Sequence, residues 1–211
     1  MKKWFLSFSF LVALLTTTSI VRAADPTIVV LGDSLSAAHG IAADQGWVSL
    51  LQKRLREQGY PHRVVNASVG GDTTRGGRER VNEVLQRHQP AILIVELGGN
   101  DGLRGLALDD MKHNLTAIIQ NAQQHGAKVL LTGMKLPPNY GPRYVDEFVN
   151  VFVELARTLN TSLVPFLLAG LDQDRTGFQS DGIHPTAASQ PRLLDNVWPH
   201  LVSLLEQTSA K

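Results

Sequence analysis

The chain has 211 residues, with 20 basic and 19 acidic side chains and no cysteine. This length predicts a single domain, and the formal charge of +1 excludes the strongly basic face that nucleic-acid binding needs. The lack of cysteine excludes thiol catalysis, disulfide bonds and cysteine-based metal sites.

The first 23 residues have the pattern of a secretory signal peptide. Lys2 and Lys3 precede an apolar run at 4–15, and small residues precede a predicted cleavage point after Ala23. The run is too short for a comfortable membrane span, although an uncleaved anchor is the alternative. Cleavage leaves one domain, residues 24–211, with a formal charge of −2. We therefore predict an exported protein without stable membrane insertion, located in the periplasm, with secretion as the alternative.

Short apolar strands alternate with amphipathic helices along the rest of the chain. This alternation is typical of a parallel sheet with right-handed crossovers. Strands are predicted at 27–31, 63–67, 91–97, 128–132 and 162–165. Helices are predicted at 47–58, 109–125, 143–159 and 187–205, with one more ending near residue 86. The pattern indicates one doubly wound α/β domain.

The first strand ends at Gly32-Asp33-Ser34, so Ser34 is expected at the carboxyl edge of the sheet, where such proteins bind ligands. A serine after Gly-Asp is usually part of a turn or a helix cap. However, Asp181-Gly182-Ile183-His184-Pro185 supplies an acid and a histidine three residues apart. Because a serine hydrolase needs this pair, we predict Ser34 as nucleophile, His184 as base and Asp181 as orienting acid.

Two further predicted strands end in glycine and a polar residue, at Gly70-Gly71-Asp72 and Gly99-Asn100-Asp101. Each tip alone is ordinary turn chemistry. Together with Ser34 they meet at one edge of a parallel sheet. Acyl transfer needs donors for the oxyanion, and the N–H groups of Ser34 and Gly71 and the Asn100 side-chain amide are the candidates.

Four segments resemble, in order, the four blocks of the GDSL, or SGNH, hydrolases. They are Gly32-Asp33-Ser34-Leu35-Ser36, Gly71, Gly99-Asn100-Asp101 and Asp181-Gly182-Ile183-His184-Pro185. Longer stretches at 66–73, 96–105 and 136–141 resemble the bacterial periplasmic thioesterase, lysophospholipase and arylesterase group. The resemblance implies a five-stranded, flavodoxin-like sheet, a catalytic set of Ser34, Asp181 and His184, and an oxyanion hole of Ser34, Gly71 and Asn100. Gly70 departs from several members of the group, which have serine there, and is expected to loosen the loop.

The resemblance also implies that the substrate is an acyl ester or thioester. Leu103 and Leu106 either line its acyl groove or simply pack their loop. No cofactor, metal or nucleic acid is expected, and the protein is expected to be a monomer. The histidines other than His184 show no metal-ligand spacing. His39, five residues after Ser34, either faces the site or only shapes its loop.

Several charged residues and alternatives remain. Asp33 and Asp101 are expected to order loops, and Glu96, on an apolar strand, needs polar partners or a place near the edge. One alternative is a phosphate- or nucleotide-binding protein, but the glycine patterns of such sites are absent from the sequence. The others are a non-catalytic lipid-binding protein and a carbohydrate deacetylase of the same superfamily.

Overall fold

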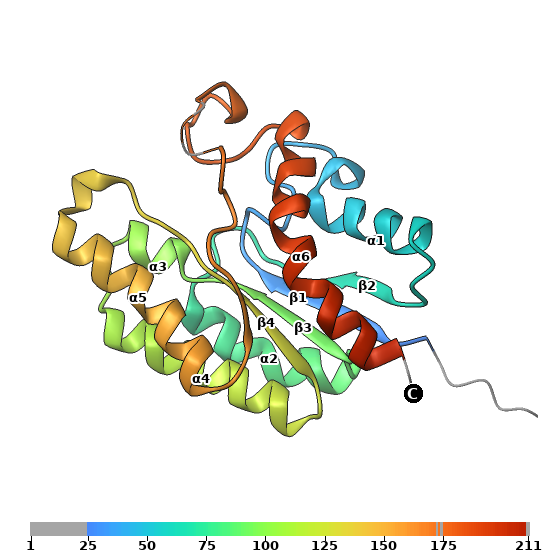
Figure 1. Cartoon of the computed structure of the whole chain (residues 1–211). Helices are drawn as coiled ribbons and strands as arrows, with labels where there is room; N and C mark the ends of the chain where they lie inside the picture. Colours follow the sequence, from blue (N-terminus) through green and yellow to red (C-terminus); the bar gives the residue numbers. More distant parts are fainter. Residues whose placement is uncertain (1–24, 172, 174, 210–211) are drawn as a thin grey trace, which may run out of the picture.

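The computed structural model describes residues 25–171, 173 and 175–209, so the predicted signal peptide lies outside the described residues. A five-stranded sheet forms the centre of the domain, with the order β2-β1-β3-β4-β5 and every neighbouring pair parallel (Figure 1). The strands are β1 (Thr27–Gly32), β2 (Arg63–Asn66), β3 (Ile92–Glu96), β4 (Lys128–Thr132) and β5 (Ser162–Val164). The predicted α/β class and five-stranded parallel sheet are confirmed.

Helices cover both faces of this sheet. Figure 1 shows α1 and α6 on one face and α2, α4 and α5 on the other. The helices are α1 (Trp47–Glu57), α2 (Thr74–His88), α3 (Gly99–Leu103), α4 (Leu108–Gln124), α5 (Pro142–Thr158) and α6 (Gln190–Ser209). Short 3₁₀ turns lie at Ala43–Gln45, Pro138–Tyr140, Arg175–Gly177 and Ala187–Ser189.

The apolar runs of the sequence explain this three-layer arrangement. Every residue of β1 and β3 is buried, because these strands lie inside the sheet and helices cover both their faces. On α1, Trp47, Leu51 and Leu55 share one helical face and are fully buried. Burial on this scale, about 25 cal/mol per Å² of apolar surface, is what holds the layers together.

Two elements differ from the sequence-based prediction. The glycine-rich stretch after β3, predicted as a loop, contains the short helix α3, because Gly98 at φ = 112° turns the chain directly out of the strand. The last helix begins at Gln190, three residues later than predicted, since Ala187–Ser189 form a separate 3₁₀ turn. That helix continues through Pro199, whose exposed position limits the cost of the missing N–H.

The strand order places a topological switch point at the carboxyl ends of β1 and β3. From β1 the chain proceeds to β2 on one side, and from β2 it crosses back to β3 on the other side of β1. Loops leaving neighbouring strands therefore diverge, which opens a crevice in doubly wound sheets. Ser34 follows β1 and Asn100 follows β3, so both residues lie at this point.

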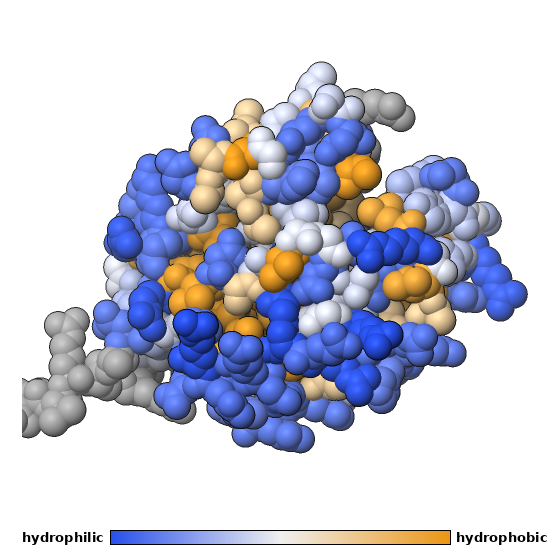
Figure 2. Space-filling model, turned by 180° about the vertical axis from the view of Figure 1, so that it is seen from behind, coloured by the Kyte–Doolittle hydropathy of each residue, from blue (hydrophilic) through white to orange (hydrophobic). Residues whose placement is uncertain are grey.

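The surface of the domain is mostly polar. On the face drawn in Figure 2, apolar residues form separate small groups between hydrophilic ones. Large hydrophobic side chains that are well exposed among the described residues are Val69, Leu106, Val153 and Ile183. Leu106 is itself a predicted site residue, and Val69 and Ile183 lie on the loops that carry Gly71 and His184. Within the described part of the chain, no helix is long and apolar enough to cross a membrane.

Candidate active site

The structure brings Ser34, His184 and Asp181 into one hydrogen-bonded line. The Ser34 Oγ lies 2.8 Å from His184 Nε2, and His184 Nδ1 lies 2.7 Å from Asp181 Oδ2. An ionised carboxylate only accepts hydrogen bonds, so the imidazole proton belongs on Nδ1. The lone pair of Nε2 then faces the Ser34 hydroxyl, which is the arrangement that deprotonates a serine.

Asp181 is held in place by its own loop. Its Oδ1 accepts the backbone N–H groups of Ile183 and His184, at 2.9 and 3.0 Å. These hydrogen bonds and the one from the His184 ring hold the pKa of Asp181 well below its usual range. Gly182, at φ = 69°, makes the tight turn possible. Asp181 therefore remains a carboxylate at any physiological pH and fixes the orientation of His184.

The loops after β1 and β2 present two unpaired backbone donors. Neither the N–H of Ser34 nor that of Gly71 donates a hydrogen bond to any described residue. Gly71 has φ = 75°, a conformation that other residues adopt only with strain, and its carbonyl accepts a 2.9 Å hydrogen bond from Arg104. Both N–H groups are therefore available to a developing oxyanion.

The third predicted donor, Asn100, is already engaged in this structure. Its side-chain nitrogen lies 3.0 Å from Asp33 Oδ2 and 2.9 Å from the Asp72 carbonyl oxygen. An amide nitrogen has two hydrogens, and these two acceptors occupy both. Asn100 is thus fixed at the crevice, and donation to a substrate requires one of its hydrogens to be shared or exchanged.

Arg80 of α2 holds the glycine-rich loop against the end of β1. Its guanidinium forms an ion pair with Asp72 at 2.8 Å and donates to the carbonyl oxygens of Gly32, at 3.2 Å, and of Ala67. The side chain is only 22% exposed, so water screens these contacts weakly. Arg80 was not predicted from the sequence, because it lies on a helix and only its tertiary contacts connect it with the site.

A buried pair of carboxyl groups lies beneath the nucleophile. Glu96 at the end of β3 is fully buried, and its Oε2 accepts a 2.6 Å hydrogen bond from the Ser36 hydroxyl and a 3.3 Å one from the Asp33 N–H. Burial and the neighbouring Asp33 raise the pKa of Glu96 well above its usual value. Burial also raises the pKa of Asp33 to about 6, against the opposing hydrogen bonds from Leu35 and Asn100. Glu96 therefore keeps its proton to a higher pH than an exposed glutamic acid does.

The loop of His39 meets the loop of His184. Their imidazole rings lie 4.2 Å apart between centroids, with planes tilted by 38°. Gln179 connects the two loops, because its Nε2 donates to the His39 carbonyl at 2.8 Å and its N–H donates to the His184 carbonyl at 2.7 Å. Of the two expectations for His39, facing the site agrees with this geometry. Gln179 was not identified from the sequence.

The two leucines proposed for the acyl groove differ in their surroundings. Leu103, the last residue of α3, is half-buried and packs against the hydrophobic core. Leu106 is 42% exposed. Tyr140 and Tyr144 hold this segment by donating their hydroxyl protons to the carbonyl oxygens of Leu103 and Leu106, at 2.8 and 2.9 Å. Leu106 is thus the one that a ligand can reach directly.

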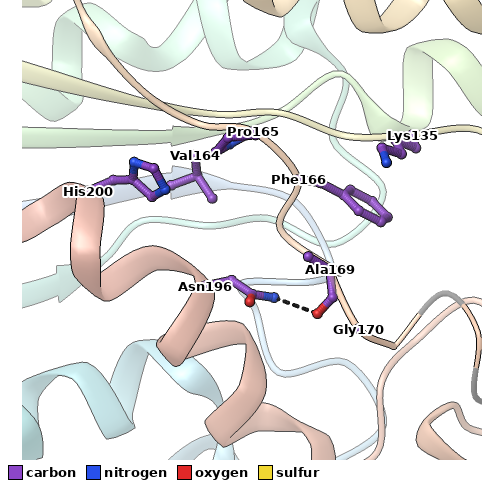
Figure 3. A pocket seen from close by; sticks show the side chains of 8 residues that line it. All are labelled: Lys135, Val164, Pro165, Phe166, Ala169, Gly170, Asn196 and His200. Atoms are coloured by element: carbon purple, nitrogen blue, oxygen red, sulfur yellow. Dashed lines mark hydrogen bonds between the residues drawn. The ribbon is translucent and has the colours of Figure 1, made fainter.

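A separate pocket of about 390 Å³ lies between the loops after β4 and β5 and helix α6 (Figure 3). Lys135, whose Nζ is 4.8 Å from the centre of the Phe166 ring, lines one side, and Asn196 and His200 line the α6 side. Both hydrogens of the Asn196 amide are donated to loop carbonyls, one of them that of Ala169. None of the predicted site residues lines this pocket.

A doubly wound sheet with a serine–histidine–aspartate line at its switch point defines a serine hydrolase class of site. The model of the GDSL-like lipase/acylhydrolase family matches residues 30–190, which include Ser34 and His184. The chain belongs to this family.

Known proteins resemble the chain over most of its length. Esterase TesA of Pseudomonas aeruginosa is 53% identical over 184 residues, which are 87% of this chain and 92% of the relative. Thioesterase 1/protease 1/lysophospholipase L1 of Escherichia coli K12 is 38% identical over 207 residues, covering 98% and 96%. The crystal structure of the psychrotrophic esterase EstA from Pseudoalteromonas sp., inhibited by monoethylphosphonate, matches with a TM-score of 0.82 at 35% identity, covering 86% of this chain and all of the other.

Proposed function

We propose that the protein hydrolyses carboxylic esters and thioesters through an acyl-enzyme intermediate on Ser34. The observation that carries this proposal is the 2.8 Å contact between Ser34 Oγ and His184 Nε2, with Asp181 bound to the opposite ring nitrogen. Relatives named as an esterase, as a thioesterase and lysophospholipase, and as an arylesterase support esters, thioesters, lysophospholipids and aryl esters as substrate classes. Short-chain esters and fatty acyl-CoA are the members of these classes that we propose.

The reaction proceeds in two balanced steps. Ser34 Oγ attacks the acyl carbon while its proton moves to His184 Nε2, and the alcohol or thiol then leaves with that proton. Water next attacks the acyl-enzyme, gives one proton to His184, and releases the acid as Ser34 recovers its hydrogen. In both steps the N–H groups of Ser34 and Gly71 bind the oxyanion, and Asn100 joins them by sharing a hydrogen with it.

The acyl chain of the substrate lies along the exposed apolar side chain of Leu106 beside the site. Half-buried Leu103 packs the same segment against the hydrophobic core.

We also propose that residues 1–23 are a signal peptide removed after Ala23, and that the domain 24–211 acts in the periplasm as a monomer. The sequence pattern of the first 23 residues supports the export, and N-terminal sequencing of the exported protein tests it.

The test compares the wild-type domain 24–211 with Ser34→Ala, using p-nitrophenyl butyrate, palmitoyl-CoA and a fluorophosphonate label. The control Ser49→Ala removes a hydroxyl on α1 that bonds the Ala43 carbonyl instead. We expect the wild type and Ser49→Ala to be active and labelled, and Ser34→Ala to lose about 10⁴-fold or more in kcat and all labelling.

Other results point elsewhere. A folded wild type that is inactive and unlabelled contradicts hydrolysis and favours a non-catalytic lipid-binding protein. Activity on acetylated sugars alone favours a carbohydrate deacetylase. Equal labelling of wild type and Ser34→Ala means that another residue is the nucleophile.

A further inference from the structure

His39, His184 and Asp181 form a three-donor cluster beside Ser34. One ligand atom from each residue, either a ring nitrogen or a carboxylate oxygen, lies within 4.8 Å of the other two. His39 and Asp181 are exposed, so an ion from solvent can reach the cluster. Two imidazoles and one carboxylate are a donor set typical of zinc sites, whereas magnesium and calcium prefer oxygen ligands alone.

We propose that this cluster is an inhibitory binding site for zinc and similar transition-metal cations. Three atoms separated by at most 4.8 Å lie within ~2.8 Å of a common point, and zinc bonds to nitrogen and oxygen at ~2.0–2.2 Å. The three atoms thus lie at most about 0.7 Å farther from that point than a zinc ligand does.

The loops that carry the three side chains are already fixed. Gln179 ties the His39 loop to the His184 loop, and the His39 N–H donates to the Ser34 carbonyl at 3.2 Å. Asp181 is oriented by two backbone N–H groups and stays ionised. The ring nitrogens of His39 have no hydrogen-bond partner among the described residues, so binding a cation breaks no existing bond there.

Occupation of this site blocks the base that the proposed function requires. His184 has two ring nitrogens, one facing Ser34 and one facing Asp181. A cation on the first takes the lone pair that accepts the serine proton, and a cation on the second displaces the proton shared with Asp181. Inhibition rests on the proposed function, whereas binding of the cation does not.

The test measures zinc binding and inhibition in His39→Phe, which removes the nitrogens but keeps a ring against His184. His113→Phe, at an exposed position of α4, is the matched control. We expect Zn²⁺ to lower activity at least tenfold in the wild type and the control, with full recovery in EDTA and no effect of Mg²⁺ or Ca²⁺. His39→Phe should need at least tenfold more zinc than the wild type for the same fractional inhibition of its own zinc-free activity.

Calorimetric titration of Zn²⁺ into Ser34→Ala and into the double variant with His39→Phe separates the two proposals. One zinc per chain, bound at least tenfold more weakly after His39→Phe, supports the site even when the wild type hydrolyses no ester. Equal zinc inhibition or equal zinc affinity with and without His39 overturns the site, whatever the enzyme's activity.

Discussion

The Ser36 hydroxyl donates a 2.6 Å hydrogen bond to Glu96, which connects the loop of the nucleophile to the end of β3. Glu96 has no exposed surface, and its second oxygen, Oε1, has no hydrogen-bond partner among the described residues. A neutral carboxyl group tolerates this environment far better than a charged one. The loop after β1 and the end of β3 are thus joined by a buried acid whose pKa is raised.

We predict that Glu96→Gln flattens the dependence of stability on pH. The folded protein keeps the Glu96 proton over a pH range in which the unfolded chain has released it, because the folded pKa is well above 4.5. The wild-type free energy of unfolding therefore decreases as pH rises through this range. Glutamine resembles the protonated acid and still accepts the hydrogen bond from Ser36, but it does not titrate. The free energy of unfolding of Glu96→Gln should therefore decrease less between pH 5 and pH 8 than that of the wild type.

Urea denaturation at several pH values measures this effect. Glu83→Gln, on the exposed side of α2, is the control and should keep the wild-type slope. The pKa of Asp33 is also raised, to about 6. Asp33 therefore contributes a decrease of the unfolding free energy with pH in all variants, at the lower end of this pH range. If the unfolding free energy of Glu96→Gln depends on pH as strongly as that of the wild type, the pKa of Glu96 is not raised in the folded protein.

Asp181→Asn should reduce kcat by about 10²–10⁴-fold while leaving the melting temperature nearly unchanged. The amide keeps an oxygen for the N–H groups of Ile183 and His184, but it cannot stabilise the imidazolium that forms during the reaction. Steady-state kinetics and thermal melting measure both effects. Asp195→Asn removes an exposed ion pair with Arg54 and serves as control, with unchanged kcat. Full activity in Asp181→Asn means that His184 needs no carboxylate.

The sheet and its polar tips were predictable, because buried parallel strands are short apolar runs and their glycine-rich ends stand out in the sequence. The contacts of Ser34, His184 and Asp181 were expected because the strand that leads to Ser34 and the loop with Asp181 and His184 were placed at the same edge of the sheet. Arg80 and Gln179 were not predictable in the same way. Each acts through a side chain that reaches another loop, and only the tertiary arrangement of helix and loop determines which carbonyl oxygens it meets.

Gly133→Ala should destabilise the fold without altering the site. A Cβ at this position lies 2.4 Å from the Pro165 carbonyl oxygen, and the N–H of Gly133 donates to Val164 at 2.7 Å, so neither backbone can easily move. We expect a loss of about 1–3 kcal/mol, which lowers the melting temperature by about 3–10 °C. Gly70→Ala is the control, since a Cβ there meets nothing within 4 Å. Equal melting temperatures in the two variants would falsify the close approach of β4 and β5.

Asn100→Ala tests whether an amide already bonded to Asp33 and Asp72 also serves the oxyanion. Loss of one oxyanion donor lowers kcat by about 10²–10³-fold with little change in KM, because the contact forms only as charge develops. The matched control is Asn114→Ala, which removes another hydrogen-bonded asparagine, one that bonds Thr74 and Arg78 between α2 and α4. Both variants should lose stability in thermal melts, but only Asn100→Ala should lose kcat. Equal kcat values in the two variants mean that Asn100 only orders the loops, and that Ser34 and Gly71 bind the oxyanion alone.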